Sequence, residues 1–393
     1  KLIARAAPLA LALGAGVALA GGPLIVDPAT ATAYHYGPAP VPVYYDLGNY
    51  GEVWDYSGAT PKLVVFDNAV GAKSVRKGYA EWSSVPTTSL RAPVQGNFSL
   101  KGLPNIDATN ITRIIGTPNG RGIYVVFDAD GSIMRDFFGV SPQVLGISSP
   151  QYSIDGTTTI TESFAVLNGS AIDPSDKGAA AFQGVVTHEF GHSLGLAHTQ
   201  VNGGVVFFQE APGPASCSAF PFSGAPARAD VETMYPYVDP TPGTGSGVGQ
   251  GAVRTLDAMA SISDLYPGPG WPNAFGTIEG KIYDLNGKTQ LTGVDVVARN
   301  INDPWQQANS AISGQMTQGQ VGPDGRFTIH GLVPGQKYVL FVDALISGGF
   351  STPAQWFLPG AEMFWSTNGN TGKYAPCNYS VITARAGTTT SAP

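Results

Sequence analysis

The sequence predicts an α+β domain built on a twisted sheet, followed by an all-β sandwich domain. Segments with strand and helix composition alternate between residues 39 and 267, whereas only short strand-like segments with turn signals follow residue 275. The 51 glycines and 31 prolines, together with a charged fraction of only 12%, indicate a loop-rich and β-rich chain. At 393 residues the chain is too long for one ordinary domain, so we expect two, joined by a linker at residues 268–274.

Residues 1–20 have the pattern of a secretory signal peptide. Lys1 and Arg5 precede an apolar run over residues 6–20, which closes with an Ala-Leu-Ala cleavage motif at residues 18–20. The run is short for a membrane span, although a membrane anchor is the alternative interpretation. We therefore expect a secreted, extracellular protein without a membrane anchor. Residues 21–38 are rich in Pro, Ala and Thr and are expected to form an irregular lead-in.

The predicted first domain covers residues 39–267 and begins with a strand and a helix. A helix over residues 67–82, capped by Asp67 or Asn68, is predicted because apolar residues recur at helical spacing. Strand composition is found at residues 42–47, 123–127, 144–147 and 158–167. A second, long helix is expected to start at residues 173–176, with Ser175 or Asp176 as its cap.

Two stretches that follow are expected to be irregular, and a helix closes the domain. Residues 199–230 and 239–252 are rich in Gly, Pro, Ala, Ser and Thr. The closing helix begins at Leu256, with Thr255 as its cap, and Pro267 ends it.

The segment His-Glu-Phe-Gly-His-Ser-Leu-Gly-Leu-Ala-His at residues 188–198 contains three of the five histidines. His188 and His192 are four residues apart, so on a helix both rings project from one face and can hold one metal ion. Glu189 lies beside them, where a general base could accept a proton from a metal-bound water. Gly195 can adopt the left-handed conformation that ends a helix, after which His198 can supply a third nitrogen. The alternative is a core helix whose histidines are merely hydrogen-bonded.

This pattern resembles the zinc site of the metzincin metalloproteases. Thr233-Met234-Tyr235-Pro236 is similar to the Met-turn of the matrixin-like members, which implies that Met234 lies below the three imidazoles without binding the metal. The closing Leu-Tyr-Pro at residues 265–267 is also similar to the end of a matrixin domain. Some metzincins have a metal-binding tyrosine where this chain has Pro236, so no fourth protein ligand is expected. Thr199, after the third histidine, leaves the subfamily open.

The resemblance implies a secreted zinc metalloendopeptidase with a zincin-like fold. His188, His192 and His198 would bind Zn²⁺, and Glu189 would activate a zinc-bound water to hydrolyse peptide bonds. The expected partners are protein or peptide substrates, and the chain is expected to be a monomer. One alternative is a non-catalytic secreted binding or adhesion protein with a structural zinc site, against which the intact Glu189 counts. A metallohydrolase for a non-peptide substrate is the other.

The predicted second domain covers residues 275–393. Strand composition recurs at residues 276–284, 295–299, 327–335 and 338–342, with turn signals at residues 286–287 and 323–325. Residues 275–345 resemble the carboxypeptidase regulatory-like, prealbumin-like β-sandwich repeat. No catalytic residue is expected here, and His330 is expected to be structural. Trp356 and Trp365 could form a binding platform, but core packing is the favoured interpretation.

Three further features bound the chemistry of the chain. A net charge of −7 and the lack of a Lys/Arg cluster argue against nucleic acid as a partner. Cys217 and Cys377 would either form a disulfide between the domains or remain two buried thiols, and both possibilities stay open. The turn at residues 128–131, Asp-Ala-Asp-Gly, could bind a structural Ca²⁺, but an unliganded turn is favoured.

Overall fold

The computed structural model describes most of the chain, in nine segments. They are residues 22–27, 29–30, 32–152, 157–199, 201–284, 286–314, 324–343, 362–367 and 375–392. The predicted signal peptide and Trp356 lie outside them. The described part is a mixed α+β fold made mostly of sheets, with few helices. None of its helices combines the length and the apolar character needed to cross a bilayer.

Short helices and strands alternate along the described chain. The helices are α1 (Asn68–Ser83), α2 (Gln183–Ser193), α3 (Gly203–Phe208), α4 (Ser246–Gln250) and α5 (Leu256–Leu265). The strands of the first half are β1 (Val26–Asp27), β2 (Thr32–Ala33), β3 (Val43–Tyr45), β4 (Gly51–Asp55), β5 (Lys62–Phe66), β6 (Val94–Asn97), β7 (Gly122–Asp128), β8 (Gly146–Tyr152) and β9 (Ile160–Asn168). The later strands are β10 (Gly276–Lys281), β11 (Asp295–Asn300), β12 (Ala308–Ile312), β13 (Arg326–Leu332), β14 (Lys337–Asp343), β15 (Met363–Phe364), β16 (Ile382–Thr383) and β17 (Thr389–Ala392).

The first half is organised around a five-stranded sheet with the order β6-β3-β7-β9-β8. Strands β6, β3, β7 and β9 run parallel, and β8 is antiparallel to β9 at the edge. Every residue of β7 is buried, as expected for an apolar strand covered on both faces. The strands predicted at residues 42–47, 123–127 and 158–167 are confirmed as β3, β7 and β9. The strand predicted at residues 144–147 is β8, which starts at Gly146 and continues to Tyr152.

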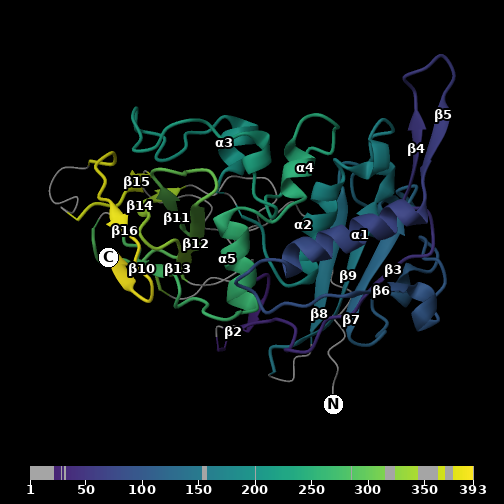
Figure 1. The fold of residues 1–393 in the computed structure, drawn as a ribbon, viewed down its shortest axis with the longest axis horizontal. Helices are drawn as coiled ribbons and strands as arrows, with labels where there is room; N and C mark the ends of the chain where they lie inside the picture. Colours follow the sequence, from purple (N-terminus) through teal and green to yellow (C-terminus); the bar gives the residue numbers. More distant parts are fainter. Residues whose placement is uncertain are drawn as a thin grey trace.

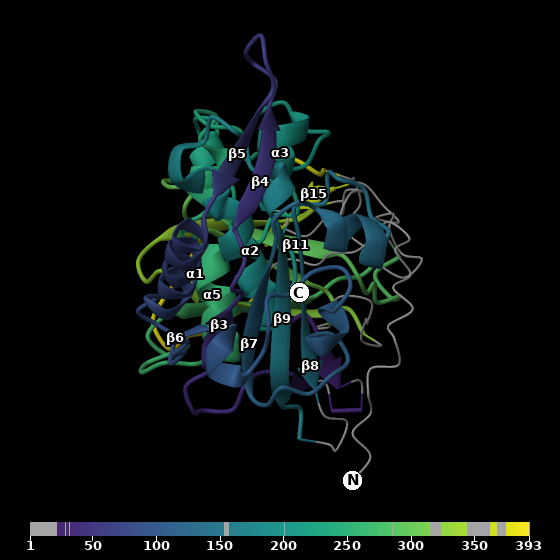
Figure 2. The same ribbon diagram turned by 90° about the vertical axis from the view of Figure 1, so that its right-hand side faces the viewer.

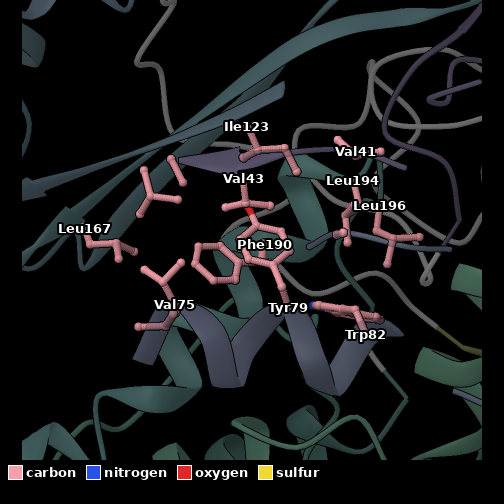
Figure 3. Packing of buried hydrophobic residues seen from close by; sticks show 14 of the residues in the cluster. Val41, Val43, Val75, Tyr79, Trp82, Ile123, Leu167, Phe190, Leu194 and Leu196 are labelled. Atoms are coloured by element: carbon pink, nitrogen blue, oxygen red, sulfur yellow. The ribbon is translucent and has the colours of Figure 1, made fainter. Parts of the chain in front are cut away.

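Helices α1 and α2 pack side by side against this sheet (Figures 1 and 2). The ring of Tyr79 from α1 stacks on Phe190 from α2, with 3.9 Å between the ring centroids (Figure 3). The indole nitrogen of Trp82 donates a hydrogen bond of 2.8 Å to the backbone carbonyl of Thr187. Asp67 caps α1, as predicted, by accepting from the amide of Val70. The contacts from α1 therefore contribute to the position of α2, which also packs against α4, β8 and β9.

Helix α2 begins later than the sequence predicted. It starts at Gln183 rather than near residues 173–176, because Gly178 and Ala179 adopt positive φ angles of 72° and 53° that interrupt a helix. The residue before α2 is Phe182, so neither Ser175 nor Asp176 is its N-cap. The carboxylate of Asp176 instead accepts hydrogen bonds from the amides of Ala180, Ala181 and Phe182, just ahead of the helix. Thr255 precedes α5 as predicted, but its side chain makes no capping hydrogen bond.

Several elements were not predicted. A ribbon formed by β4 and β5 projects from the first half (Figure 1). The stretches at residues 199–230 and 239–252, predicted to be irregular, contain the short helices α3 and α4. The lead-in forms the small β1–β2 pair and buries Tyr34 and Tyr36 in the main core, although its composition suggested an irregular segment.

The later strands form two sheets that share one hydrophobic cluster. Strands β13, β10 and β17 form one sheet, and β12, β11, β14 and β15 form the other, with β16 paired to β14. Ile278, Phe327, Val296 and Leu340 are among the cluster residues contributed by both sheets. The sequence missed β12, whose residues Ala-Asn-Ser-Ala-Ile lack strong strand character. Trp365 packs against this cluster, in agreement with the core-packing interpretation.

The two halves are joined through a shared apolar cluster and a disulfide. Val201 and Phe222 pack with Val339 and Phe341 of the later sheet. Cys217 and Cys377 form a disulfide, which decides between the two alternatives left open by the sequence. The predicted linker packs against the rest of the chain, since Trp271 is buried and donates from its indole nitrogen to Asp264. His330 pairs with the same carboxylate at 2.9 Å, consistent with a structural role.

Candidate metal centre

The three predicted histidine ligands come together in the structure. The Nε2 atom of His198 lies 3.1 Å from Nε2 of His192 and 3.2 Å from Nε2 of His188. Among the His, Cys, Asp and Glu residues of the described segments, these three histidines form a group whose potential ligand atoms all lie within 4.8 Å of one another. Three imidazole nitrogens directed at one point can hold a metal ion. The expectation that no fourth protein residue binds the ion stays a prediction.

The protonation of two imidazoles follows from their backbone contacts. The Nδ1 atom of His188 lies 2.9 Å from the carbonyl oxygen of Thr233, and Nδ1 of His192 lies 2.8 Å from that of Leu196. A carbonyl oxygen can only accept, so both Nδ1 atoms carry the proton and donate it. The Nε2 atoms consequently have free lone pairs. This is the tautomer that a metal requires, and the carbonyls hold each ring in place.

Burial reinforces this state of the histidines. It lowers the pKa of His188 to about 3, with a further contribution from His198. The same cause lowers the pKa of His192 well below its ordinary value. Both rings are therefore neutral at neutral pH, and neutral imidazole is the form that binds metal. The three imidazole nitrogens therefore fit a metal ion that proteins bind through histidine.

The loop that carries His198 leaves α2 as predicted. Gly195 has a φ of 97°, a left-handed conformation that glycine adopts without strain. The amide of Leu196 donates to the carbonyl of Gly191, which closes the end of the helix. The lead-in also holds this loop, because the amide of Leu24 donates to Gly195 and the amide of Ala197 donates to Gly22. No motif in the lead-in indicated this contact.

Met234 is fully buried directly against α2. A Cβ added to Gly191 would overlap the Sδ atom of Met234 and would lie 2.9 Å from its Cε atom. Gly191 is therefore the residue that lets Met234 approach the helix between the two histidines. The amide of Thr199 donates to the carbonyl of Met234 at 3.0 Å. The turn at Met234 is thus hydrogen-bonded to the loop that carries His198.

Glu189 is buried beside the histidines, and its Oε2 atom has no hydrogen-bond partner among the described residues. Its carboxylate lies against β8, where a Cβ on Gly146 would come within 2.7 Å of its Cδ and Oε1 atoms. The absence of a side chain at Gly146 therefore makes room for the carboxylate. Sequence reasoning missed Gly146, because it lies far from Glu189 along the chain and their contact leaves no local signal. Burial raises the pKa of Glu189 to about 8, and a nearby cation would lower it again.

Serine side chains connect α2 to the two strands beside it. The hydroxyl of Ser163 on β9 donates to the carbonyl of Ser193 at 2.7 Å. The hydroxyls of Ser148 on β8 and Ser193 on α2 are hydrogen-bonded at 2.8 Å. These contacts place the edge strand next to the helix that carries Glu189. Nothing in the sequence pattern singled out these serines.

The turn at residues 128–131 uses its carboxylates within the chain. Asp128 accepts hydrogen bonds from the amides of Ile133 and Met134, and Asp130 accepts from the amide of Ser132. Gly131 has a φ of 72°, as this turn requires. These bonds are those of a self-supporting turn, and the calcium hypothesis for it stays a prediction.

Comparisons of the chain with models of known protein families, with curated proteins and with solved structures found no match.

Proposed function

We propose that the protein is a zinc-dependent endopeptidase of the metzincin type, closest to the matrixins. The observation that carries the proposal is the convergence of three imidazole Nε2 atoms beside a buried carboxylate with a free oxygen. A structural metal site has no use for such a carboxylate, whereas hydrolysis needs a base beside the metal. Met234, packed against α2 and hydrogen-bonded to the loop of His198, supports assignment to this superfamily.

The roles of the residues follow from their positions. His188, His192 and His198 would hold the ion, and Zn²⁺ bound there would supply Lewis acidity to a substrate carbonyl and to water. Glu189 would accept a proton from the water that attacks the carbonyl carbon, through its free Oε2 atom. As the bond between carbon and nitrogen breaks, Glu189 would return this proton to the leaving amine. The backbone acceptors at Thr233 and Leu196 would keep the imidazoles oriented throughout.

The edge strand β8 provides a surface for an extended peptide. In the described part of the chain no strand pairs with its outer edge, and its first residue contacts Glu189. A peptide can add to such an edge through backbone hydrogen bonds, which favours protein segments over compact substrates. Beyond His198, the exposed rings of Phe208 and Tyr237 contact each other and offer an apolar surface to substrate side chains.

Secretion and the nature of the second unit belong to the same proposal. Secretion is supported by the signal-peptide pattern and by the disulfide between Cys217 and Cys377, which forms in oxidising compartments. The two sheets formed by strands β10 to β17 are proposed to be a carboxypeptidase regulatory-like sandwich, because they share one hydrophobic core. This second unit would stabilise or orient the catalytic domain rather than take part in the chemistry.

Cleavage of casein or gelatin by the purified protein tests the proposal. We expect cleavage that is lost with 1,10-phenanthroline and restored by Zn²⁺ but not by Mg²⁺. Internal cuts, identified by mass spectrometry of the fragments, would distinguish an endopeptidase from an exopeptidase. Protein that holds one zinc per chain but leaves both substrates intact would instead favour the non-catalytic binding protein.

A further inference from the structure

A side chain from the later strands holds the stretch that follows the third histidine. Arg299 lies on β11 and is almost completely buried. Its guanidinium donates a hydrogen bond of 2.7 Å to the backbone carbonyl of Val201 and another of 2.7 Å to Oδ1 of Asn202. Both acceptors lie within four residues of His198 along the chain. The later sheet therefore contacts the metal-binding loop through a buried, charged group.

Asn202 connects this contact to the turn at Met234. Its backbone amide donates to Oε2 of Glu232 at 3.1 Å, and Glu232 lies two residues before Met234. Its side-chain amide donates to the carbonyl of Trp305 at 2.7 Å, in the connection between β11 and β12. Asn202 thus joins three parts of the molecule, which are the loop of His198, the turn at Met234 and the later strands.

Arg299 is itself held in a defined orientation. Its guanidinium also donates to the carbonyl of Pro304 at 2.8 Å. The guanidinium carbon lies over the ring of Trp305, 4.9 Å from the ring centroid. A planar guanidinium fixed in this way can hold two acceptors at set positions, whereas the single ammonium group of a lysine cannot. The acceptors at Val201 and Asn202 are therefore held together as a pair.

An apolar contact attaches the loop on the other side of the third histidine. Ala197, the residue directly before His198, packs with Ile312 of β12 and with Leu24 of the lead-in. Its amide donates to the carbonyl of Gly22 at 2.8 Å. Strands β11 and β12 are hydrogen-bonded neighbours. His198 therefore lies between two points of attachment that both involve the same later sheet.

We propose that Arg299 positions the third metal ligand, so that the second unit is part of the catalytic site rather than a separable accessory. This inference rests on the proposed function, because it concerns the same metal centre. His188 and His192 lie on α2, whereas His198 follows the end of that helix and depends on its loop. Metal ligands must be held within about 0.5 Å of their productive positions. The contacts from β11 and β12 on the two sides of His198 supply this constraint.

Zinc affinity and cobalt spectra of variants of the full chain test this inference. Arg299→Ala should bind zinc about tenfold more weakly in a chelator competition, because the third imidazole is no longer held in place. The visible absorption bands of the Co²⁺-loaded variant should shift, since they depend on the arrangement of the ligands. Arg299→Lys keeps the charge but not the paired donors, so it should bind zinc with an intermediate affinity.

The kinetics of casein cleavage give a further measurement. Arg299 is buried and cannot contact a substrate, so its loss should lower kcat while KM stays near the wild-type value.

Two more variants separate positioning from general stability. Phe327→Leu, in the core shared by the two later sheets, should lower Tm but leave zinc affinity and the cobalt spectrum unchanged. Ile312→Ala trims the other attachment of the loop and should also weaken zinc binding, which keeps the inference testable if the arginine variants do not fold. All comparisons are made at a temperature where circular dichroism shows the variants to be folded.

Several outcomes would overturn the inference. Folded Arg299→Ala protein with the zinc affinity and the cobalt spectrum of wild type would do so, whatever its activity. If the arginine variants do not fold, wild-type zinc affinity in Ile312→Ala would do so. An equal loss of zinc affinity in Phe327→Leu would show a general effect of stability instead. Wild-type protein that binds zinc but cleaves no casein would contradict the proposed function, and the metal measurements would still decide the role of Arg299.

Discussion

The Nδ1 atom of His188 lies 2.9 Å from the carbonyl oxygen of Thr233, the residue directly before Met234. The next carbonyl, that of Met234, accepts a hydrogen bond from the amide of Thr199, the residue directly after His198. One turn therefore positions the first and the third histidine together. Both acceptors are backbone carbonyls, so the course of the chain through this turn, and not the methionine side chain, orients the two histidines.

Replacement of His198 by alanine should reduce metal binding. The remaining two imidazoles cannot complete the triad, so we expect zinc affinity to fall by at least about tenfold. Zinc per chain, measured by mass spectrometry after dialysis against a weak chelator, checks this. His35→Ala is the matched control, because His35 lies outside the triad, and it should retain full zinc. Unchanged zinc in His198→Ala would disprove its role as the third ligand.

Replacement of Gly191 by alanine should destabilise the protein and disturb the site. The new Cβ would overlap Met234 and lie 3.0 Å from the Trp82 ring. Overpacking of this kind costs about 1–3 kcal/mol, which exceeds the gain of about 1 kcal/mol from the better helix propensity of alanine. Chemical denaturation measures the loss. Gly37→Ala, where a Cβ meets no atom within 4 Å, serves as the control and should change stability little. A Gly191→Ala variant as stable as wild type would contradict the tight contact with Met234.

The local parts of the site could be predicted because they depend on local geometry. Helical spacing places His188 and His192 on one face, and a glycine at position 195 permits the left-handed turn that leads to His198. The contacts that complete the site could not be predicted in this way. Gly146 and the acceptor at Thr233 approach α2 only through the tertiary fold, and their composition carries no periodic signal.

The fold shows the same division between local and long-range information. Helix α1 was predicted from its spacing and cap, whereas α2 started late because Gly178 and Ala179 take left-handed conformations. Because alanine rarely adopts a left-handed conformation, the residue type at position 179 did not predict this interruption of the helix. Strand β12 was missed because its polar sequence forms a strand only where β11 supplies hydrogen bonds. Tertiary context decides such segments.

The pair formed by His330 and Asp264 should make stability depend on pH. The hydrogen bond to Asp264 raises the pKa of His330 above its ordinary value of 6.5. A raised pKa in the folded state means that the stabilisation is fully present below about pH 6.5 and is lost as the pH rises through the folded value. The Tm of wild type should therefore exceed that of His330→Gln more at pH 5.5 than at pH 9. A Tm difference that is constant, or that grows with pH, would contradict this pairing.

Loss of the disulfide between Cys217 and Cys377 should destabilise the junction of the two halves. The bridge closes a loop across 160 positions, and removing such a bridge costs about 2–5 kcal/mol. The Cys217→Ser/Cys377→Ser double variant should unfold at a lower temperature than wild type, and wild type treated with reductant should approach it. The same Tm in oxidised and reduced wild-type protein would contradict a stabilising bridge.

The rate of peptide-bond cleavage by Glu189→Gln, measured at the zinc content of wild type, tests the central claim most directly. Glutamine keeps the size of the side chain but cannot accept a proton, so cleavage of casein should fall by roughly 10²–10⁴-fold while zinc stays at one per chain. Glu81→Gln, on α1, controls for the substitution itself and should cleave at the wild-type rate. Cleavage by zinc-loaded Glu189→Gln at the wild-type rate would contradict the account.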